Sequence, residues 1–504
     1  MWLRHVVGRG LDRAPEALAL RDGRRDVSWR RLHRDVEALA FRLRTGTPRG
    51  SRVLVLSGNR VEVLETYLAC AAAGLVAAPV NPALTDREIA AILESVEPAA
   101  AVADAEGLAR LRGLCPGLPL TDITEVGELP DAEEGSTAHE GSSLTDPVMI
   151  LHTSATTGTA KGVVVDQRSL QLNALSWLAD VGPEPGTVFL NAGPLFHGSV
   201  VIALDHLAAG GTVCVLDRFT PQGCLAALER WEVEQAFLVP SMVRLVLDTR
   251  ALATTELGAL RLLLHGAAPM PAELASEARE RLGVELQTVF GITEGGGPVL
   301  SLAPYGAVGE PPVPGAVCAG RPMLGTELKI ADSEGREVAT GTIGELHVSG
   351  DGLMQGYWKR PEATAEVLHD GWLNTHDLGC VDEAGQVWVV DRRNDLILRG
   401  GQNVYPAEIE HVLRQSPHVA DVVVVPVVSP IWGQVPVAFV APVSEEAFDA
   451  GELLGLCIDG LAAYKRPSHF LPLESIPRNP AGKALRPRLR ELAHRLIIES
   501  EGTP

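Results

Sequence analysis

The chain has 504 residues, more than one hydrophobic core supports, and its length alone suggests about three domains of roughly 150 residues each. Hydrophobic residues make up 46% and charged residues 21%, proportions that are ordinary for a soluble globular enzyme. The formal net charge of −21 argues against a nucleic acid as the main partner, because phosphate backbones attract basic surfaces.

The cysteines and apolar stretches bear on the compartment. Seven cysteines stand singly and form no Cys-x-x-Cys pair, so we expect neither a disulfide framework nor a zinc–cysteine site. The segment from Met1 to His5 is not a basic region followed by an apolar core, so we expect no secretory signal. The longest apolar stretch, near 67–80, is too short to span a bilayer. We therefore expect a cytoplasmic protein without a membrane span.

Strand and helix signals alternate over the first hundred residues. Short apolar runs at 52–56, 75–80 and 99–103 predict buried strands, and the segment 61–74 between the first two predicts a helix. Thr85 and Glu88 have the spacing of a capping box, which predicts a helix beginning there. Strands that alternate with helices predict parallel βαβ units.

A predicted loop precedes the most informative segment. Residues 126–145 are acidic and rich in Gly, Ser and Thr, which predicts an exposed loop. The run Val148-Met-Ile-Leu151 follows and predicts a buried strand that leads into a hydroxyl-rich segment.

A second α/β pattern lies near the C-terminus. The strand signal at 387–390 precedes the charged turn Asp391-Arg-Arg-Asn-Asp395, after which 406–413 predicts a helix with proline in its first turn. Residues 422–425 predict the next strand. Because the charged turn separates two complete α/β patterns, we expect a domain boundary there, with domains at 1–393 and 394–504.

The strongest local feature is the segment His152-Thr-Ser-Ala-Thr-Thr-Gly-Thr-Ala-Lys-Gly162. Five hydroxyl residues, two glycines and one lysine lie within eleven positions, directly after a predicted strand. Hydroxyl groups, free backbone N–H groups and the charge of Lys161 can together wrap a polyphosphate. The spacing differs from the GxxxxGK[ST] pattern of a P-loop. From composition alone, a phosphate loop and a polar surface loop are equally supported.

This segment resembles the phosphate loop of the adenylate-forming superfamily, which includes acyl-CoA synthetases, peptide-synthetase adenylation domains and luciferase. The family usually reads TSGTTGxPKG, and here Ala155 and Ala160 stand for the first glycine and the proline. The resemblance implies that ATP phosphates contact the hydroxyl groups, backbone and ammonium of this loop. The residues concerned are Thr153, Ser154, Thr156, Thr157, Gly158 and Lys161.

Three further motifs follow in the family's order. Pro194-Leu-Phe-His197 is similar to the segment that borders the acyl pocket, which implies pocket roles for Phe196 and His197. Gly266-Ala267-Ala268-Pro269 resembles the turn that lies against adenine. Phe290-Gly-Ile-Thr-Glu294 resembles the motif in which the aromatic ring stacks on adenine, Thr293 contacts the α-phosphate and Glu294 binds Mg²⁺. Gly295 follows as an expected part of the acyl pocket.

The C-terminal motifs agree with this pattern. Leu373-Asn-Thr-His-Asp377 resembles the motif whose aspartate holds the ribose hydroxyls, and Asp391-Arg392-Arg-Asn394-Asp395 resembles the hinge segment. Arg392 stands where the family contacts ribose or phosphate, and Asn394 occupies the hinge position. Arg399 to Glu410 is similar to the acyl-CoA synthetase version of the next motif, with Gly400 and Gly401 at the pantetheine tunnel. The segment 477–483 resembles the loop of the catalytic lysine, Lys483.

The resemblance covers almost the whole chain, from about Arg13 to Leu489. It implies an α/β fold, with a large multi-subdomain N-terminal α/β domain and a small mobile α+β C-terminal domain. It also implies an acid–thiol ligase that uses ATP and Mg²⁺, with CoA as co-substrate. The implied catalytic residues are Lys483, Glu294, Thr293 and His197. The implied partners are a small carboxylic acid and either CoA or a carrier protein.

The departures from the family pattern keep other functions open. His376 stands for a glycine, Asn394 for Asp or Lys, and Asn479 for Thr. The alternatives are an adenylation enzyme that loads a carrier protein, an enzyme whose acceptor is nitrogen or another nucleophile, and a non-catalytic nucleotide or acyl sensor. Retention of Lys483 and Glu294 favours an enzyme over a sensor, because a pure binder does not need the full set of charges.

Overall fold

The computed structural model describes residues 2–130, 143–153, 161–304, 309–393, 395–399, 402–429, 431–479 and 482–501. Their contacts divide the chain into two compact units. Unit 1 comprises Met1–Pro304, Pro322–Glu327 and Val348–Leu373, and unit 2 comprises Tyr305–Arg321, Leu328–His347 and Asn374–Pro504. The mixed α/β class, with a larger N-terminal and a smaller C-terminal part, is confirmed. The boundary after residue 393 stays a prediction.

One sheet of unit 1 has seven strands in the order β18-β8-β7-β4-β3-β5-β6. The strands β4, β3, β5 and β6 run parallel, which confirms the βαβ pattern, and β7 and β8 form an antiparallel pair. The strands are β3 (Arg52–Leu56), β4 (Val76–Val80), β5 (Ala100–Ala103), β6 (Leu120–Asp122), β7 (Pro147–Thr153), β8 (Lys161–Asp166) and β18 (Gly356–Tyr357).

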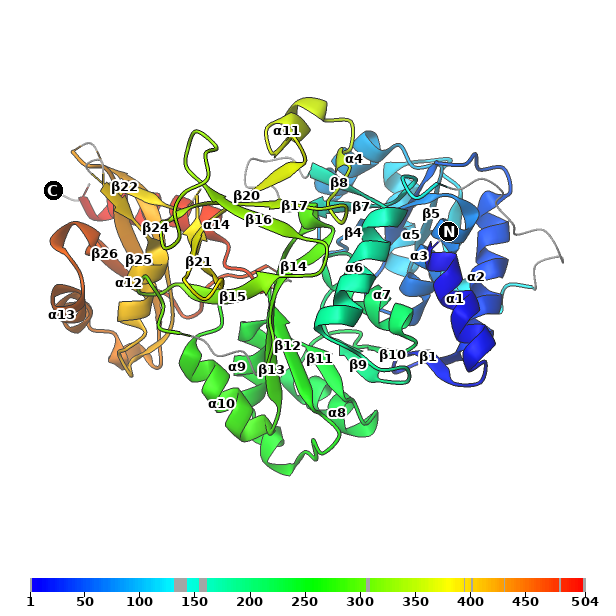
Figure 1. Cartoon of the computed structure of the whole chain (residues 1–504), viewed down its shortest axis with the longest axis horizontal. Coiled ribbons are helices and arrows are strands. Elements are labelled where there is room, and N and C mark those ends of the chain that lie inside the picture. Colours follow the sequence, from blue (N-terminus) through cyan, green and yellow to red (C-terminus); the bar gives the residue numbers. More distant parts are fainter. Residues whose placement is uncertain are drawn as a thin grey trace. The chain divides into compact units, whose positions relative to one another are not determined.

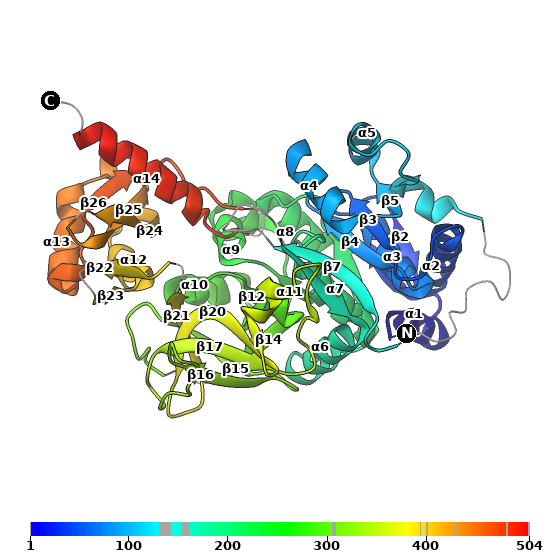
Figure 2. The ribbon, with the colours of Figure 1, turned by 90° about the horizontal axis from the view of Figure 1, so that it is seen from above.

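Helices cover both faces of this sheet (Figure 2). Apolar side chains of two helices, α4 (Asp86–Val96) and α5 (Ala105–Leu114), form a buried cluster with β3, β4 and β5. The other face meets α3 (Val61–Ala73), against which α1 (Trp2–Arg13) and α2 (Trp29–Arg44) pack. The capping box at Thr85 is confirmed, because its hydroxyl accepts from Glu88 N and the Glu88 carboxylate accepts from Thr85 N. These two reciprocal hydrogen bonds fix the residue at which α4 begins.

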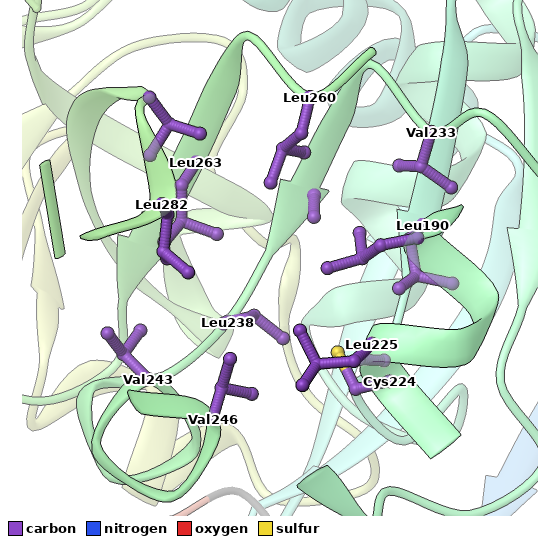
Figure 3. Close-up of a cluster of buried hydrophobic side chains, with 14 of the residues drawn as sticks. Leu190, Cys224, Leu225, Val233, Leu238, Val243, Val246, Leu260, Leu263 and Leu282 are labelled. Atoms are coloured by element: carbon purple, nitrogen blue, oxygen red, sulfur yellow. The ribbon is translucent and has the colours of Figure 1, made fainter. Parts of the chain in front are cut away.

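The second sheet of unit 1 has the order β14-β13-β12-β11-β9-β10-β1-β2. Its faces are covered by α6 (Gln167–Asp180) and α7 (Ser199–Ala209) on one side and by α8 (Pro221–Arg230), α9 (Pro240–Asp248) and α10 (Ala272–Leu282) on the other. Figure 3 shows the latter core, where Leu190, Leu225, Leu238, Val246 and Leu263 meet. The strands are β1 (Leu18–Arg21), β2 (Asp26–Ser28), β9 (Val188–Asn191), β10 (Thr212–Val215), β11 (Gln235–Phe237), β12 (Leu262–Gly266), β13 (Glu285–Ile292) and β14 (Gly297–Leu302).

Unit 2 contains two groups of strands (Figure 1). In the first, neighbours follow the order β16-β17-β20-β21-β15, and β19 pairs with β20. Their bounds are β15 (Val317–Pro322), β16 (Glu327–Ala331), β17 (Gly344–Ser349), β19 (Leu368–His369), β20 (Trp372–Val381) and β21 (Val387–Arg392). Of these, β19 lies wholly within unit 1, as does α11 (Pro361–Ala365), and β15, β16, β17 and β20 include some residues of unit 1. The paired strands β20 and β21 place the predicted ribose aspartate and the hinge arginine side by side.

The second sheet of unit 2 has the order β23-β22-β25-β24, with β26 beside β25. Alternate residues of β24 face opposite sides: Val422 and Val424 meet α12 and α13, whereas Val423 and Val425 meet α14. Helices therefore cover both faces of the sheet (Figure 2). The elements are β22 (Ile397–Arg399), β23 (Gln402–Val404), α12 (Pro406–Leu413), β24 (Val419–Ser429), β25 (Gly433–Pro442), α13 (Ala450–Gly460), β26 (His469–Pro472) and α14 (Arg486–Glu501).

The predicted exposed loop at 126–145 is wrong at its N-terminal end. Residues Ile123–Glu128 form a 3₁₀ helix in which Val126 is fully buried. Asp122 caps this helix by accepting a hydrogen bond from Thr124 N. Residues up to Glu128 are therefore part of a 3₁₀ helix and do not belong to the loop. No helix among the described residues is long and apolar enough to cross a membrane.

Candidate functional site

The ends of the predicted phosphate loop lie together. In the β7–β8 pair Thr153 is the partner of Lys161, and the Thr153 hydroxyl donates to the Lys161 carbonyl oxygen at 3.4 Å. The predicted residues Ser154, Thr156, Thr157 and Gly158, and the substitution Ala155, lie outside the described residues. Because antiparallel pairing fixes both ends, Lys161 begins β8 directly beside the last residue before the loop.

Lys161 and Glu294 both contact one tyrosine. The Lys161 ammonium lies over the Tyr357 ring, 4.7 Å from its centroid, and the Tyr357 hydroxyl donates to Glu294 Oε1 at 2.8 Å. Burial and the Glu294 charge raise the pKa of Tyr357, so the hydroxyl keeps its proton at neutral pH. The sequence analysis did not identify Tyr357, and the only sequence signal for it is its position in the short run Gly356-Tyr357-Trp358.

The glycine run after Glu294 is required by close packing. Glu294 lies in a single 3₁₀ turn, Thr293–Gly295, directly after β13. A Cβ on Gly296, whose φ is +74°, would lie 2.3 Å from the Gly352 carbonyl oxygen, and one on Gly295 would lie 2.9 Å from a Val299 methyl group. A side chain at Gly296 would therefore clash with backbone and one at Gly295 would crowd neighbouring side chains, so this turn is closely packed.

The predicted adenine residues come from neighbouring strands. Gly266 ends β12 and pairs with Val289, which precedes Phe290 on β13. A Cβ at Gly266 would lie 2.1 Å from the Val289 carbonyl oxygen, so the strands approach closely only because this residue is glycine. Ala267 follows with φ +63° and is exposed, and Ala268 is half-buried. Phe290 is half-buried at the end of the same pair.

The segment that carries Phe196 and His197 is held from α3 and its N-terminal side. The Asn59 side chain donates to Gly193 O and accepts from Leu195 N, and the Tyr67 hydroxyl donates to Leu195 O. The Phe196 and His197 rings lie 6.0 Å apart, and both are half-buried.

A second histidine lies near this segment. His152 Nδ1 bonds the Pro79 carbonyl oxygen at 3.3 Å. Burial, together with a smaller effect of the His197 charge, lowers the pKa of His152 to about 4, so His152 is neutral at pH 7.

In unit 2, the predicted ribose aspartate, Asp377, lies beside Arg392 and is influenced by the charge of Lys483. Asp377 on β20 pairs with Arg392 on β21, and Arg392 Nε donates to Asp377 Oδ1 at 3.0 Å. Burial raises the pKa of Asp377, whereas the positive charges of Arg392 and Lys483 lower it. Asp377 is 3% exposed and its Oδ2 has no hydrogen-bond partner. A buried carboxylate oxygen without a donor is costly, and two ribose hydroxyls are donors of the kind that it lacks.

His376 adopts a conformation that glycine adopts most easily. Its φ is +58°, in the left-handed region, and its N–H donates to Asn374 Oδ1 at 2.8 Å. The sequence identified His376 as a replacement for glycine, and the backbone gives the reason why glycine suits this position.

Lys483 projects from a loop with its own hydrogen bonds. Asn479 Oδ1 accepts from Lys483 N at 2.9 Å, and Lys483 O accepts from Asn479 N at 2.8 Å. Arg478 donates to Gly482 O and to Asp421 on β24. The asparagine that stands for the family's threonine therefore closes the turn around the lysine.

A partly buried ionic cluster follows this loop and begins three residues after Lys483. Arg486 Nη2 donates to Glu410 Oε1 on α12 at 2.9 Å, and its Nε lies 3.4 Å from Asp395 Oδ2. Arg490 also pairs with Asp395. Asp391 Oδ2 accepts from Ala407 N at the start of α12. The cluster joins the lysine loop to the residues on both sides of Asn394. Asn394, Gly400 and Gly401 themselves lie outside the described residues.

Two family models match the chain. The model of the AMP-binding enzyme family matches residues 8–358, and the model of the AMP-binding enzyme C-terminal domain matches 408–483. The chain belongs to the AMP-binding enzyme family. A feruloyl-CoA synthase of Amycolatopsis is 35% identical over 95% of this chain and 96% of its own. A fatty acid–[acyl-carrier-protein] ligase, ScoC of Streptomyces coeruleorubidus, is 33% identical over 93% and 92%.

Solved structures agree with this assignment. ATP-bound MatB from Rhodopseudomonas palustris superimposes with a TM-score of 0.89 at 28% identity, covering 98% of this chain and 99% of that one. The o-succinylbenzoate CoA synthetase of Bacillus subtilis with its acyl-adenylate gives 0.85 at 28%, covering 96% and 97%. The amide bond synthetase McbA of Marinactinospora thermotolerans gives 0.87 at 29%, covering 97% and 99%.

The strain at His376 generates a prediction for this AMP-binding enzyme. Substituting His376→Gly removes the left-handed penalty but adds chain entropy, so the free energy of unfolding should change by less than about 1 kcal/mol. Substituting His376→Val should lower it by more than about 1 kcal/mol, because a β-branched residue resists positive φ. Urea unfolding of both variants measures the difference. Equal stability of the two variants would contradict the backbone argument.

Asp391 generates a prediction on pH. Burial raises the pKa of Asp391 to about 7, with Arg486 lowering it and Glu410 raising it again. The unfolded carboxyl titrates near 4, so between about pH 4 and 7 the folded state binds more protons and stability falls as pH rises. In Asp391→Asn, the fall in unfolding free energy between pH 5 and pH 8 should be smaller than in the wild type. An unchanged pH slope would show that the carboxyl titrates normally.

Proposed function

We propose that the protein is an ATP-dependent acyl-CoA synthetase, an acid–thiol ligase that forms an acyl-AMP intermediate. Family membership along most of the chain and relatives named as CoA ligases support this activity. The observation that carries the proposal within the molecule is the Asp377 group: a buried carboxylate with one oxygen lacking a donor, beside Arg392 and the charge of Lys483. That arrangement suits a ribose next to an α-phosphate.

The proposed first step joins the acid to AMP. A substrate carboxylate oxygen attacks the α-phosphorus of ATP, and the bond from that phosphorus to the pyrophosphate oxygen breaks. The acid is already ionised at pH 7, so no general base is needed. Lys483 neutralises charge on the carboxylate and α-phosphate as the bond loosens, and Thr293 contacts the α-phosphate. Lys161 and the hydroxyl loop hold the β- and γ-phosphates.

The donor set around Glu294 fits one magnesium ion. A single carboxylate together with phosphate oxygens and water is a common magnesium environment. Glu294 is half-buried, and within the described part of the chain three or more acidic, histidine or cysteine side chains nowhere form a metal cluster. Bound Mg²⁺ would supply positive charge to the phosphates. The protein's own part is to hold Glu294 at a fixed place.

The proposed second step transfers the acyl group to a thiol. The C-terminal domain, residues 394–504, rotates about Asn394, so that Lys483 leaves and the segment with Gly400 and Gly401 admits the pantetheine arm. The thiol sulfur attacks the acyl carbon, the thiol proton leaves, and the bond to AMP breaks. His197, Phe196 and Gly295 border the acyl group, and Gly266, Ala267, Ala268 and Phe290 hold the adenine.

Two other acceptors remain as alternatives. ScoC is named a ligase for an acyl-carrier protein, and McbA is named an amide bond synthetase, at identities close to those of the CoA ligases. Preformed acyl-AMP offered together with CoA, an acyl-carrier protein and an amine separates them. We expect the CoA thioester to dominate, and dominance of another product would replace CoA by that acceptor.

Lys483→Ala tests the assignment of the first step. Loss of one transition-state donor should reduce adenylation about 10²–10³-fold, measured as ATP–pyrophosphate exchange. Transfer from preformed acyl-AMP to CoA should keep its rate, because Lys483 does not take part. Lys359→Ala is the matched control, since that lysine pairs with Glu97 at the surface and lies over the Trp358 ring, 6.0 Å from its centroid, and it should leave both rates unchanged. Equal losses in both half-reactions of Lys483→Ala would refute the two-state assignment.

A further inference from the structure

Tyr357 contacts two charged groups of opposite sign at once. Its ring face receives the Lys161 ammonium and its hydroxyl donates to Glu294 Oε1. Among the described residues, Lys161 and Glu294 form no ion pair with each other, so the tyrosine ring is what links them. Lys161 lies in β8, and Glu294 lies in the turn after β13. These two elements are far apart in the sequence, so no connecting loop fixes the distance between the two charges.

The position of Tyr357 is fixed by its neighbours. It lies in β18, which pairs with β8 through Tyr357 and Val163, and the next residue, Trp358, donates its N–H to Gly162 O at 2.7 Å. Thr364 Oγ1 accepts from Tyr357 N at 2.8 Å. The tyrosine is 8% exposed, so its ring has little freedom.

Trp358 anchors the same segment to the sheet. Its side chain packs against Val76, Ile150 and Val164, and its indole N–H donates to Ser95 O at 3.1 Å. A short β18 would otherwise be held by few contacts. The tyrosine is therefore placed by the seven-stranded sheet itself, next to the first residue of β8.

The turn that carries Glu294 is tied to the same segment. Met354 N donates to Glu294 O at 2.9 Å, and the Gly352 carbonyl oxygen lies against Gly296. Segment 350–358 therefore makes two contacts. Its backbone at Met354 contacts the turn that carries Glu294, and the Tyr357 ring near its C-terminal end contacts Lys161.

We infer that Tyr357 is a positioning residue that sets the spacing between Lys161 and Glu294, with its ring face holding the ammonium and its hydroxyl holding the carboxylate. The inference rests on the proposed function, in which Lys161 serves the phosphates and Glu294 serves Mg²⁺. A direct Lys161–Glu294 pair would neutralise both groups and occupy the carboxylate. With the ring between them, Oε1 is oriented by the hydroxyl and Oε2 remains for a cation.

The two contacts can be removed separately. Tyr357→Phe keeps the ring face over Lys161 and removes only the hydroxyl, so Glu294 loses its orientation. Loss of a hydrogen bond to a charged group should raise the Mg²⁺ concentration for half-maximal ATP binding about tenfold. At saturating Mg²⁺ the affinity for ATP should stay within about twofold, because Lys161 is still held. Calorimetric titration of ATP at several Mg²⁺ concentrations measures both quantities without turnover.

Tyr357→Leu removes the ring as well. Lys161 and Glu294 are then free to pair directly, and ATP affinity should fall about tenfold even at saturating Mg²⁺, in addition to the Mg²⁺ shift. The matched control is Tyr67→Phe, which also removes one buried hydroxyl bond, from Tyr67 to Leu195 O at 3.2 Å, but touches neither charge. Its Mg²⁺ dependence should equal that of the wild type, whatever it loses in stability.

The outcomes separate the inference from the proposed function. An unchanged or lowered Mg²⁺ requirement in Tyr357→Phe would overturn the positioning role, as would the same shift in Tyr67→Phe. Wild-type protein that binds Mg²⁺ and ATP but shows no ATP–pyrophosphate exchange with any acid would count against the proposed function. The binding titrations would still decide the role of Tyr357 in that case.

Discussion

The position of the lysine loop in the C-terminal half of the predicted site depends on a largely buried guanidinium, that of Arg486. Arg486 is fixed by Glu410 on α12 and by Asp395, and a charge that is largely withdrawn from water needs such partners. Because Arg486 stands three residues after Lys483, the same contacts determine where the lysine loop leaves the sheet. Asp391 and Asp395 lie on either side of the predicted hinge residue, so the cluster also ties the hinge segment to the helix that follows the lysine.

Each unit holds one group of the predicted charged residues. In unit 1 the strand pair β7–β8, the turn after β13 and Tyr357 hold Lys161 and Glu294. In unit 2 the pair β20–β21 holds Asp377 and Arg392 beside the charge of Lys483. A division of charges between the two units suits an enzyme in which the catalytic lysine acts in the first half-reaction alone.

Much of the fold followed from the sequence. Apolar runs at 52–56 and 422–425 became β3 and part of β24, and the Thr85–Glu88 spacing became a capping box, because these signals are local. The loop predicted at 126–145 was wrong where the Asp122 cap and burial of Val126 formed a 3₁₀ helix. Side-chain partners far apart in the chain, such as Tyr357 with Glu294 or Arg486 with Glu410, left no local signal. The site assignments themselves stay predictions.

The most direct test of the account is pyrophosphate release by the wild-type protein. A panel of aromatic, aliphatic and dicarboxylic acids would be supplied with ATP and Mg²⁺, with and without CoA, and products identified by mass spectrometry. The account predicts release that depends on one or a few of the acids and a matching CoA thioester when CoA is present. A folded protein that binds ATP but releases no pyrophosphate with any acid would contradict it.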